Sequence, residues 1–339
     1  VGLFFVWFDP VSIEERALHG PCHRTPAVSH RVSFFVSVPW VGGPKMKVMR
    51  LSPLLLLAMV ACAINEGVGE ADRWKPFPGA LADTESRDLT SEVTGRTYRI
   101  SVALPQDYAT SNKTYPVLYA VDANTQFGTV VEAARLLHLE EAVPELIIVG
   151  IGYPVGWLTN GDGWRLVDLT PTVDSSKGGG GEAPGFLEFM RRELIPLVEA
   201  EFRARPKGRA LYGHSLGGLY ALYALFAGEG TFERYIAGSP SFGWDDRVIL
   251  RQEAVYAESH DFLSARLFLS SGSLENSEEW GESVAEVKKF VTKLATRSYR
   301  ELQVATAYFS DETHMSVIPA TVSRGLRAVY EGSVLSEHD

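Results

Sequence analysis

Ser215 lies between two glycines in the run GHSLGG, residues 213–218, at the spacing of a nucleophile elbow. At such an elbow a strand turns sharply into a helix, and the flanking glycines leave room for the strained backbone. Residues 209–212 have the pattern of a short buried strand and residues 216–227 that of an apolar helix. We therefore interpret Ser215 as a catalytic nucleophile, with a glycine-rich packing turn as the alternative.

A serine hydroxyl needs a base within hydrogen-bond reach, and that base is nearly always a histidine. Some histidines lie before the expected mature chain, one adjoins Ser215 and one lies at the C-terminus. Without these, three candidates are left: His138, His260 and His314. A chain with this elbow runs in the order serine, acid, histidine, with the histidine after the last strand. His314 meets that requirement and is the expected base; a surface loop histidine is the alternative.

The acid is expected just past the strand predicted at 265–271, where Glu275 stands. Three other carboxylates are near enough in sequence to compete, namely Glu278, Glu279 and Asp311. An oxyanion needs two backbone N–H donors. We expect one from Leu216 at a helix N-terminus and one from residues 122–124, where Asp122 is expected to brace the loop.

The remaining pattern predicts an α/β fold with a mostly parallel central sheet and helices on both faces, formed by one domain over residues 64–339. Strands are predicted at 88–93, 97–103, 115–121, 146–151, 209–212, 234–238, 265–271 and 302–309. Helices are predicted at 130–139, 185–202, 216–227 and 277–296.

A long loop follows the strand at 146–151 and extends from Tyr153 to Ala183. Loops of this length are usually functional or disordered, and this one leaves the sheet edge where open α/β sheets bind ligands. We expect it to face the substrate, with the contacts made by Tyr153, Trp157, Trp164 and Arg165, and by Trp244 from elsewhere in the chain. The alternative is a solvated insertion in which Arg165 and Asp168 pair with each other.

The N-terminal part has a different character. Residues 1–45 are expected to be an extension outside the fold, attached by a mistaken start or poorly ordered. Residues 46–63 have a short positive start, ten apolar residues and a small-residue end, which predicts a secretory signal. Two processing sites are open: lipidation of Cys62 in a bacterial lipobox, or cleavage after Ala63. Either predicts export, to the periplasm, to a lipid-anchored position or to the medium.

The composition is that of an ordinary globular protein, 45% hydrophobic and 22% charged over 339 residues. A formal net charge of −10 argues against a nucleic-acid surface. The two cysteines, Cys22 and Cys62, provide no disulfide framework. Close His, Asp and Glu spacing of the zinc-hydrolase kind is absent from the sequence, so we expect neither metal nor cofactor, and the oligomeric state is left open.

Several motifs together resemble the esterase D-like group of α/β-hydrolases, especially hydrolases related to ferric-siderophore (enterochelin and bacillibactin) esterases. They are residues 115–119 with Asp122, 165–171, 186–196, 213–218, 239–241 and 312–314. The resemblance implies an ester hydrolase acting on a small-molecule ester, with Ser215 as nucleophile, His314 as base and Glu275 at the acid position. In the related mycolyl transferases the N–H two residues beyond the aspartate contributes to the oxyanion site, which implies Asn124.

The chain departs from this group at one position, where Ala123 replaces a glycine that commonly follows Asp122. The substrate remains open between siderophore esters and small acyl esters. The resemblance also leaves acyl transfer as an alternative to hydrolysis. A noncatalytic binding protein with this fold is a further alternative, although such a protein is expected to lose the serine, the base or the elbow glycines.

Overall fold

The computed structural model describes residues 81–154, 163–277 and 281–332, without the side chains of 276–277 and 281–282. All of them belong to the second of two units, residues 77–339. The extension predicted at 1–45 and the export signal predicted at 46–63 lie outside the described residues and stay predictions. Trp157, Glu278 and Glu279 lie outside them too.

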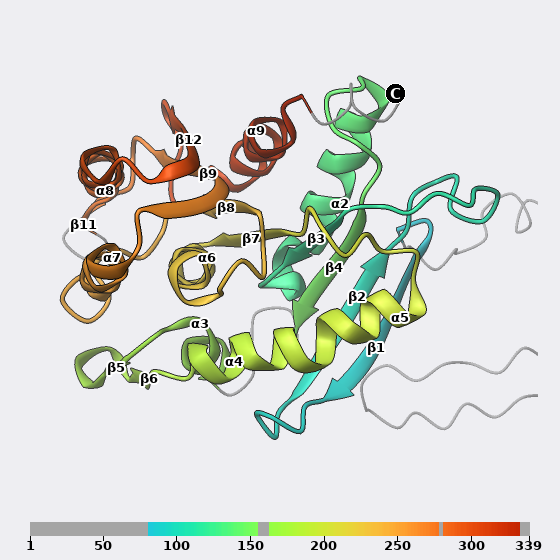
Figure 1. Cartoon of the computed structure of the whole chain (residues 1–339), viewed down its shortest axis with the longest axis horizontal. Coiled ribbons are helices and arrows are strands. Elements are labelled where there is room, and N and C mark those ends of the chain that lie inside the picture. The colour runs from blue at the N-terminus through green and yellow to red at the C-terminus, as the bar shows by residue number, and fades with distance from the viewer. Residues whose placement is uncertain (1–80, 155–162, 278–280, 333–339) are drawn as a thin grey trace, which may run out of the picture. The chain divides into compact units, whose positions relative to one another are not determined.

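The centre of the fold is an eight-stranded sheet, whose strands lie in the order β1-β2-β4-β3-β7-β8-β9-β12 (Figure 1). The pairs β1-β2 and β2-β4 are antiparallel, and all the other neighbours are parallel. The prediction of a mostly parallel sheet is therefore confirmed. The strands are β1 (Thr84–Thr90), β2 (Thr97–Ala103), β3 (Val117–Ala120), β4 (Ile147–Gly152), β7 (Ala210–His214), β8 (Arg234–Gly238), β9 (Phe262–Gly272) and β12 (Arg300–Phe309).

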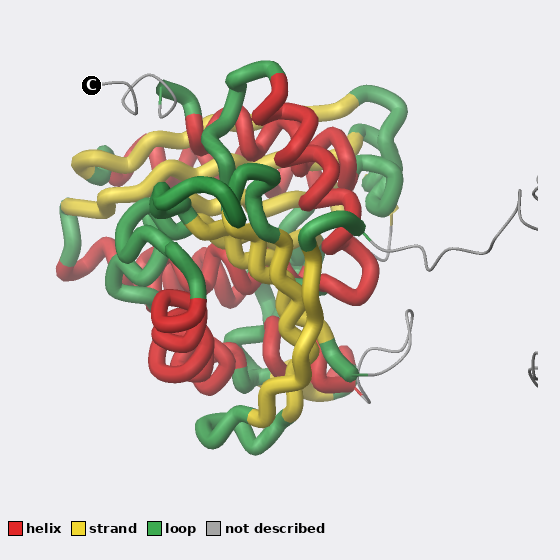
Figure 2. Tube along the Cα trace, turned by 90° about the vertical axis from the view of Figure 1, so that its right-hand side faces the viewer, coloured by secondary structure: helices red, strands yellow, loops and turns green. Residues whose placement is uncertain are grey.

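The middle strands are apolar because both of their faces are covered. Every residue of β3, β4 and β7 is buried, as expected for parallel strands between two layers of helices. Figure 2 shows these strands twisting through the fold with helices on both sides.

Two hydrophobic cores lie on the two faces of the sheet. One forms where α2 (Ala123–Leu139) and α9 (Ile318–Tyr330) pack on one face, and the other where the remaining helices pack on the opposite face. Those helices are α3 (Trp164–Leu169), α4 (Ala183–Phe189), α5 (Ile195–Glu201), α6 (Leu216–Ala227), α7 (Val248–Ser259) and α8 (Ser283–Arg297). A π-helical turn, Met190–Leu194, joins α4 to α5, so that they form one continuous helical segment.

Several elements differ from the sequence prediction. The helix expected at 130–139 begins at Ala123, directly after Asp122, because the chain turns into it without a loop. The segment 153–183 is not a plain loop: it contains α3 and the short hairpin of β5 (Val173–Asp174) and β6 (Gly179–Gly180). Helices α7 and α9 were not predicted. The remaining two strands, β10 (Asn276–Ser277) and β11 (Gly281–Glu282), form a separate pair.

Of the helices within the described ranges, none has both the length and the apolar character to cross a bilayer.

The close packing of α9 against the sheet gives a first prediction. A Cβ at Gly325 in α9 would lie 2.5 Å from Ile236 Cγ2 and 3.0 Å from Phe268 Cδ1. A Cβ at Gly185 in α4 would lie 3.9 Å from its nearest neighbour, Thr94 Cγ2, which is ordinary van der Waals contact. We expect Gly325→Ala to lower the free energy of unfolding by about 1–3 kcal/mol through overpacking. Gly185→Ala is the matched control and should raise it by about 0.5–1 kcal/mol, because alanine favours the helix. Urea unfolding followed by circular dichroism measures both. Equal stabilisation by the two changes would contradict this packing of α9.

Candidate active site

Ser215 lies in the turn from β7 to α6, with φ 61° and ψ −118°. A positive φ is uncommon for a residue with a side chain. The flanking glycines are required by close approach: a Cβ at Gly213 would lie 2.1 Å from the Gly217 carbonyl oxygen, and one at Gly217 would lie 2.8 Å from Val121 Cγ2. The strand, turn and helix expected around Ser215 are therefore all present, and the turn presents the serine at the carboxyl end of β7.

Ser215 is buried as a residue, at 7% exposure, although it lines a cavity described below. Its Oγ lies 3.4 Å from Ser241 Oγ. Backbone bonds hold the turn in place, because the Ser215 N–H donates to the Gly238 carbonyl at 2.9 Å and the Ser241 N–H donates to the Ser215 carbonyl at 3.1 Å. The nucleophile candidate is thus fixed by its neighbours at the end of β8.

His314 and Glu275 form a hydrogen-bonded pair, with 2.8 Å between His314 Nδ1 and Glu275 Oε2. His314 follows β12 and Glu275 follows β9, whose carboxyl ends are adjacent because these strands pair in parallel. The other carboxylate oxygen, Oε1, accepts the Ser239 hydroxyl at 2.6 Å and the Gly272 N–H at 2.5 Å. This arrangement fixes the imidazole and leaves Nε2 as its second proton-transfer atom.

These contacts also set the charge of Glu275. Burial works to raise the pKa of this carboxyl, but the hydrogen bonds from His314, Ser239 and Gly272 outweigh it and hold the pKa below the ordinary value of 4.5. Glu275 is therefore a carboxylate at neutral pH and can stabilise an imidazolium on His314.

The competing acids do not have this environment. Asp311 is exposed, and its backbone N–H bonds to Ser273 Oγ at 2.9 Å. Glu278 and Glu279 belong to the undescribed stretch. Among the described carboxylates, Glu275 is the one that hydrogen-bonds to His314.

His214 packs beside the base, with its ring centroid 4.6 Å from that of His314. It is 2% exposed, and neither ring nitrogen has a hydrogen-bond partner within the described structure. Burial, followed by repulsion from His314, lowers the pKa of His214 to about 3. His214 is consequently neutral near pH 7 and does not oppose a positive charge on His314.

Two helix N-termini meet near Ser215, and they carry the two oxyanion candidates. Leu216 begins α6, and Asn124 is the second residue of α2. The side chain of Asn124 is occupied, because its Oδ1 accepts the Tyr153 N–H at 2.7 Å and its Nδ2 donates to the Tyr153 carbonyl at 2.8 Å. The expected oxyanion role concerns its backbone N–H, at the positive end of the α2 dipole.

The alanine at position 123 fits this turn. Asp122 takes the left-handed conformation, with φ 58°, whereas Ala123 already belongs to the helix and does not have a positive φ. A glycine is therefore not required there for backbone reasons.

Asp122 and Arg165 form a bidentate ion pair, with 2.6 Å from Nε to Oδ1 and 2.8 Å from the second guanidinium nitrogen to Oδ2. Both side chains are mostly buried, at 6% and 21% exposure. The expectation that Asp122 braces this loop agrees with the contact. The alternative in which Arg165 pairs with Asp168 is wrong, because Arg165 pairs with Asp122.

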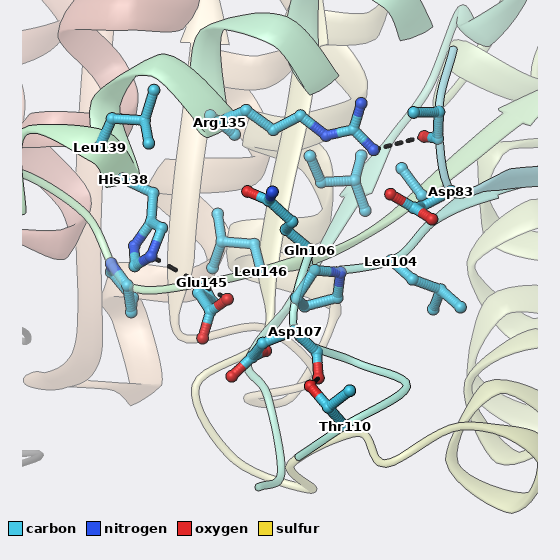
Figure 3. A pocket seen from close by; sticks show the side chains of 16 residues that line it. Asp83, Leu104, Gln106, Asp107, Thr110, Arg135, His138, Leu139, Glu145 and Leu146 are labelled. Atoms are coloured by element: carbon cyan, nitrogen blue, oxygen red, sulfur yellow. Dashed lines mark hydrogen bonds and ion pairs between the residues drawn. The ribbon is translucent and has the colours of Figure 1, made fainter. Parts of the chain in front are cut away.

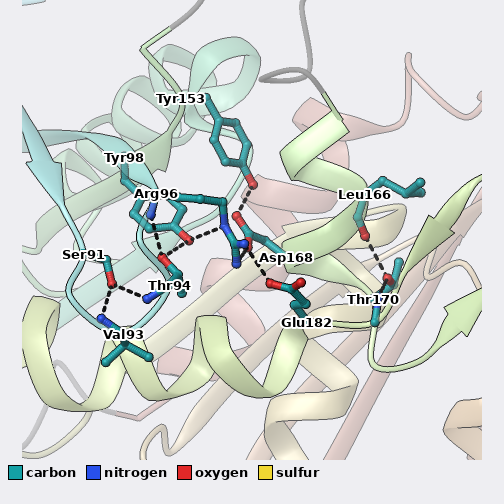
Figure 4. Close-up of polar contacts among 11 residues, drawn as sticks. Ser91, Val93, Thr94, Arg96, Tyr98, Tyr153, Leu166, Asp168, Thr170 and Glu182 are labelled. Carbon is teal, nitrogen blue, oxygen red and sulfur yellow. Dashed lines mark hydrogen bonds and ion pairs between the residues drawn. The ribbon is translucent and has the colours of Figure 1, made fainter.

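Asp168 instead belongs to a second buried cluster, shown in Figure 4. Arg96, in the turn between β1 and β2, approaches Asp168 Oδ1 at 2.6 Å and Glu182 at 2.7 Å. The Tyr153 hydroxyl donates to Asp168 Oδ2 at 3.1 Å. These contacts anchor α3, the helix that carries Arg165, to the β1-β2 turn and to the end of β4.

A cavity of about 520 Å³ opens beside Ser215. Its lining combines aromatic side chains, three cationic side chains and one carboxylate. The lining includes Ser215, Leu216, Arg165, Lys177, Trp244 and Arg247. Such a volume and lining are typical of a site for a small molecule.

The residues predicted to contact substrate separate into two groups. Arg165 and Trp244 line this cavity. Tyr153 does not line it: the residue is 5% exposed and its hydroxyl is used by Asp168. Trp164 packs edge-on against Tyr153, with ring centroids 6.3 Å apart, and is not among the lining residues either. Tyr153 and Trp164 therefore support the site from the core.

Lys177 and Arg247 also line the cavity but were missed by sequence reasoning. Lys177 immediately precedes the run of four glycines at 178–181, which was the available indication that this segment has an unusual backbone. For Arg247 the sequence contains no comparable indication.

A larger cavity, of about 650 Å³, lies elsewhere (Figure 3). It is lined by the end of β2, the start of β4 and side chains of α2 such as Arg135 and His138. These lie at the amino ends of the parallel strands, whereas Ser215 lies at a carboxyl end. The chemistry described above therefore belongs to the smaller cavity. In the described part of the chain, no three His, Cys, Asp or Glu side chains group closely enough to hold a metal ion.

Comparisons with known proteins agree on one family. The family model described as "Putative esterase" matches residues 91–314. The ferri-bacillibactin esterase of Bacillus subtilis is 33% identical over 264 residues, covering 73% of this chain and 89% of that protein. The siderophore triacetylfusarinine C esterase of Aspergillus fumigatus is 34% identical over 284 residues, covering 76% and 96%. An IroE-like serine hydrolase from Shewanella oneidensis superimposes with a TM-score of 0.66 at 28% identity, covering 73% and 80%.

The buried Asp168 cluster predicts a pH dependence of stability. Burial raises the pKa of Asp168 from 3.8 to about 6 despite the attraction of Arg96. The folded chain thus holds this proton more tightly than the unfolded chain does, and the resulting stability, present below about pH 4, is lost as the pH rises through 6. Relative to the wild type, Asp168→Asn should gain up to about 3 kcal/mol in unfolding free energy between pH 4 and pH 7.5.

Asp261→Asn is the control of opposite sign. Asp261 is exposed, and its hydrogen bond with Arg300 lowers its pKa, so its contribution is lost as the pH falls. Urea titrations of the three proteins at both pH values measure the differences. If the unfolding free energies of the wild type and Asp168→Asn differ by the same amount at both pH values, the raised pKa of Asp168 is contradicted.

Proposed function

This chain belongs to the esterase family and is an ester hydrolase of the α/β-hydrolase fold, and we propose that Ser215, His314 and Glu275 carry out its chemistry. The observation that carries this proposal is the hydrogen bond between His314 and Glu275, together with a serine held at positive φ. The bond joins the loops after β9 and β12, and His314 also packs against His214 at the end of β7, with 4.6 Å between the ring centroids.

In the first half of the reaction, Ser215 Oγ attacks the ester carbonyl carbon while His314 Nε2 takes the hydroxyl proton. The carbonyl electron pair moves onto oxygen and forms a tetrahedral oxyanion. The backbone N–H groups of Leu216 and Asn124 are assigned to this oxyanion, each at the N-terminus of a helix. The ionised Glu275 stabilises the imidazolium.

The oxyanion then collapses, the bond to the leaving oxygen breaks, and His314 gives its proton to the departing alcohol. This leaves an acyl group on Ser215. In the second half, His314 takes a proton from a water molecule, the hydroxide adds to the acyl carbon, and Ser215 leaves with the proton returned by His314. The products are an alcohol and a carboxylic acid.

We further propose that the substrate is an ester of the siderophore class. The support is twofold: the relatives at 33% and 34% identity are named as siderophore esterases, and the cavity beside Ser215 is lined by three cationic side chains in a chain of net charge −10. Iron-loaded catecholate siderophores such as ferri-bacillibactin are bulky and anionic, which an aromatic cavity with cationic side chains suits.

A fluorophosphonate probe tests the nucleophile. We expect the probe to modify the wild-type chain at residue 215, and Ser215→Ala and His314→Ala to abolish the modification, because one removes the attacking oxygen and the other its base. Peptide mass spectrometry locates the adduct. Ser241→Ala is the control, since Ser241 Oγ is only 3.4 Å from Ser215 Oγ; the adduct should remain on residue 215. An adduct on Ser241, or none on a folded protein, would sink the assignment.

With the same variants, hydrolysis of an iron-loaded cyclic triester siderophore, followed by chromatography with mass detection, tests the substrate class. We expect ring-opened acid products from the wild type and none from Ser215→Ala. Cleavage of simple aryl esters without any siderophore cleavage would exclude the siderophore proposal and keep the esterase. Transfer of the acyl group to an added alcohol in preference to water would favour the acyltransferase.

The role of Glu275 is tested by Glu275→Gln, which keeps the side-chain shape and removes the charge. We expect kcat for aryl ester hydrolysis to fall by a factor of about 10²–10⁴, as in other triads whose acid is made an amide. Asp311→Asn is the matched control and should stay within about twofold of the wild type, because Asp311 is an exposed carboxylate that does not contact the imidazole. The reverse result would transfer the acid role to Asp311.

A further inference from the structure

The charges that line the cavity are not equally available to a substrate. Arg165 is neutralised by its bidentate pair with Asp122. Arg247 is bidentate with Glu286, at 3.1 and 3.2 Å, and Glu286 also pairs with Lys289 at 3.0 Å. Lys177 is exposed and forms no salt bridge with another described side chain, although Asp174 of the same hairpin attracts it electrostatically. Among the three cations that line the cavity, Lys177 is therefore the one that is not held in a direct ion pair with a described side chain.

Lys177 is carried by the small hairpin of β5 and β6. The hairpin returns through four consecutive glycines, Gly178 to Gly181, all with φ between 91° and 119°. Two of them are required by packing: a Cβ at Gly181 would lie 2.8 Å from Val173 Cγ2, and one at Gly180 would lie 2.9 Å from Trp244 Cζ2 and 2.2 Å from Thr170 Oγ1. The hairpin thus lies directly against Trp244, a lining residue of the same cavity.

Hydrogen bonds attach the hairpin to the turn that follows β8. Trp244 Nε1 donates to the Thr172 carbonyl at 3.0 Å, and the Thr172 hydroxyl donates to Asp245 Oδ2 at 2.7 Å. The hairpin's own carboxylate, Asp174, accepts the Asp245 N–H at 3.2 Å and the Ser176 hydroxyl at 2.6 Å. The backbone that carries Lys177 is therefore held by contacts with the wall of the cavity.

The turn on the other side is itself strained. Asp245, Asp246 and Arg247 have φ of 41°, 47° and 59° in succession. Residues with side chains persist at positive φ only where the surroundings fix them, and such strain gathers at ligand sites. Hairpin and turn together form a structured rim beside Ser215.

We propose that Lys177 is a specificity-determining residue, which selects esters that carry an anionic group by pairing with that group at the rim of the cavity. The inference rests on the proposed function of this site. A lone exposed lysine contributes little to binding unless its position is defined, and the close packing of Gly180 on Thr170 and Trp244 holds the backbone that carries Lys177. Gly180 is accordingly a positioning residue for Lys177.

The test compares two aryl esters of the same length and shape. 4-Nitrophenyl pentanoate is neutral, and mono-4-nitrophenyl glutarate differs by a terminal carboxylate. The measured quantity is the selectivity ratio, kcat/KM for the glutarate ester divided by kcat/KM for the pentanoate ester. We expect Lys177→Gln to lower this ratio about two- to fivefold, through KM of the glutarate ester, and Lys177→Glu to lower it further. The difference in selectivity ratio between the wild type and the Lys177 variants should become smaller at high salt.

Lys207→Gln is the matched charge control. Lys207 is exposed and lies just before the amino end of β7, at the sheet edge opposite Ser215, so its loss should leave the ratio unchanged. If both lysine variants lower the selectivity ratio equally, the effect arises from the net charge of the protein and not from the place of Lys177, and the proposal is overturned.

The positioning role is tested by Gly180→Ala against Gly179→Ala. Both glycines have positive φ, at 91° and 119°, so both changes strain the backbone, but a Cβ at Gly179 meets nothing within 4 Å. We expect Gly180→Ala to lower the selectivity ratio more than Gly179→Ala does. Equal effects would show that the close packing of Gly180 on Thr170 and Trp244 does not position Lys177.

The outcomes separate this inference from the proposed function. Loss of all ester hydrolysis in Ser215→Ala, with a ratio that does not respond to Lys177, would leave the catalytic proposal intact and reject this one. Hydrolysis that survives in Ser215→Ala would reject the catalytic proposal itself.

Discussion

The turn at Ser215 packs so closely against its neighbours that two positions in it have no space for a methyl group. Gly213 faces the backbone of Gly217, and Gly217 faces Val121 and Asp122 at the end of β3. This contact brings two strand-to-helix turns together, so that the N-termini of α6 and α2 meet at one point. The rest of the site depends on that constraint, because the serine, the expected oxyanion donors and the cavity all take their positions from it.

Buried ion pairs connect the turn at Ser215 to more distant parts of the fold. Asp122 is held by Arg165, Arg165 is carried by α3, and α3 is fixed through Asp168 to Arg96 and Tyr153. Each of these groups would be costly to bury alone, and each has a partner. The consequence is a connected set of contacts that reaches from the first hairpin of the sheet to the turn at Asp122, over parts of the chain distant in sequence.

Much of the fold could be predicted from residue pattern, because buried parallel strands such as those at 117–120 and 147–152 are continuous apolar runs. Strand order placed His314 and the expected acid at neighbouring strand ends but left Glu278, Glu279 and Asp311 in competition with Glu275; the hydrogen bond to His314 distinguishes Glu275 from Asp311. Other features depend on tertiary contacts that a sequence does not display. Tyr153 and Trp164 read as substrate residues because they are aromatic and near the sheet edge, but whether a ring faces a cavity or the core is decided by packing. Helix α9 does show apolar residues at helical spacing, at Ile318, Val322, Leu326 and Val329, so there the information was present in the chain.

The hairpin that carries Lys177 lies outside the central sheet and touches the remainder of the site through Trp244, Thr172 and Asp174. It shares no backbone with the turns that hold Ser215, His314 or Glu275. Under the roles proposed for Lys177 and Ser215, substitution, shortening or lengthening of this segment during evolution would alter which esters are accepted and leave the proposed catalytic groups in place. A descendant protein could thus acquire a different range of ester substrates through a few substitutions at the surface. Packing constrains such positions much less than it constrains the buried strands.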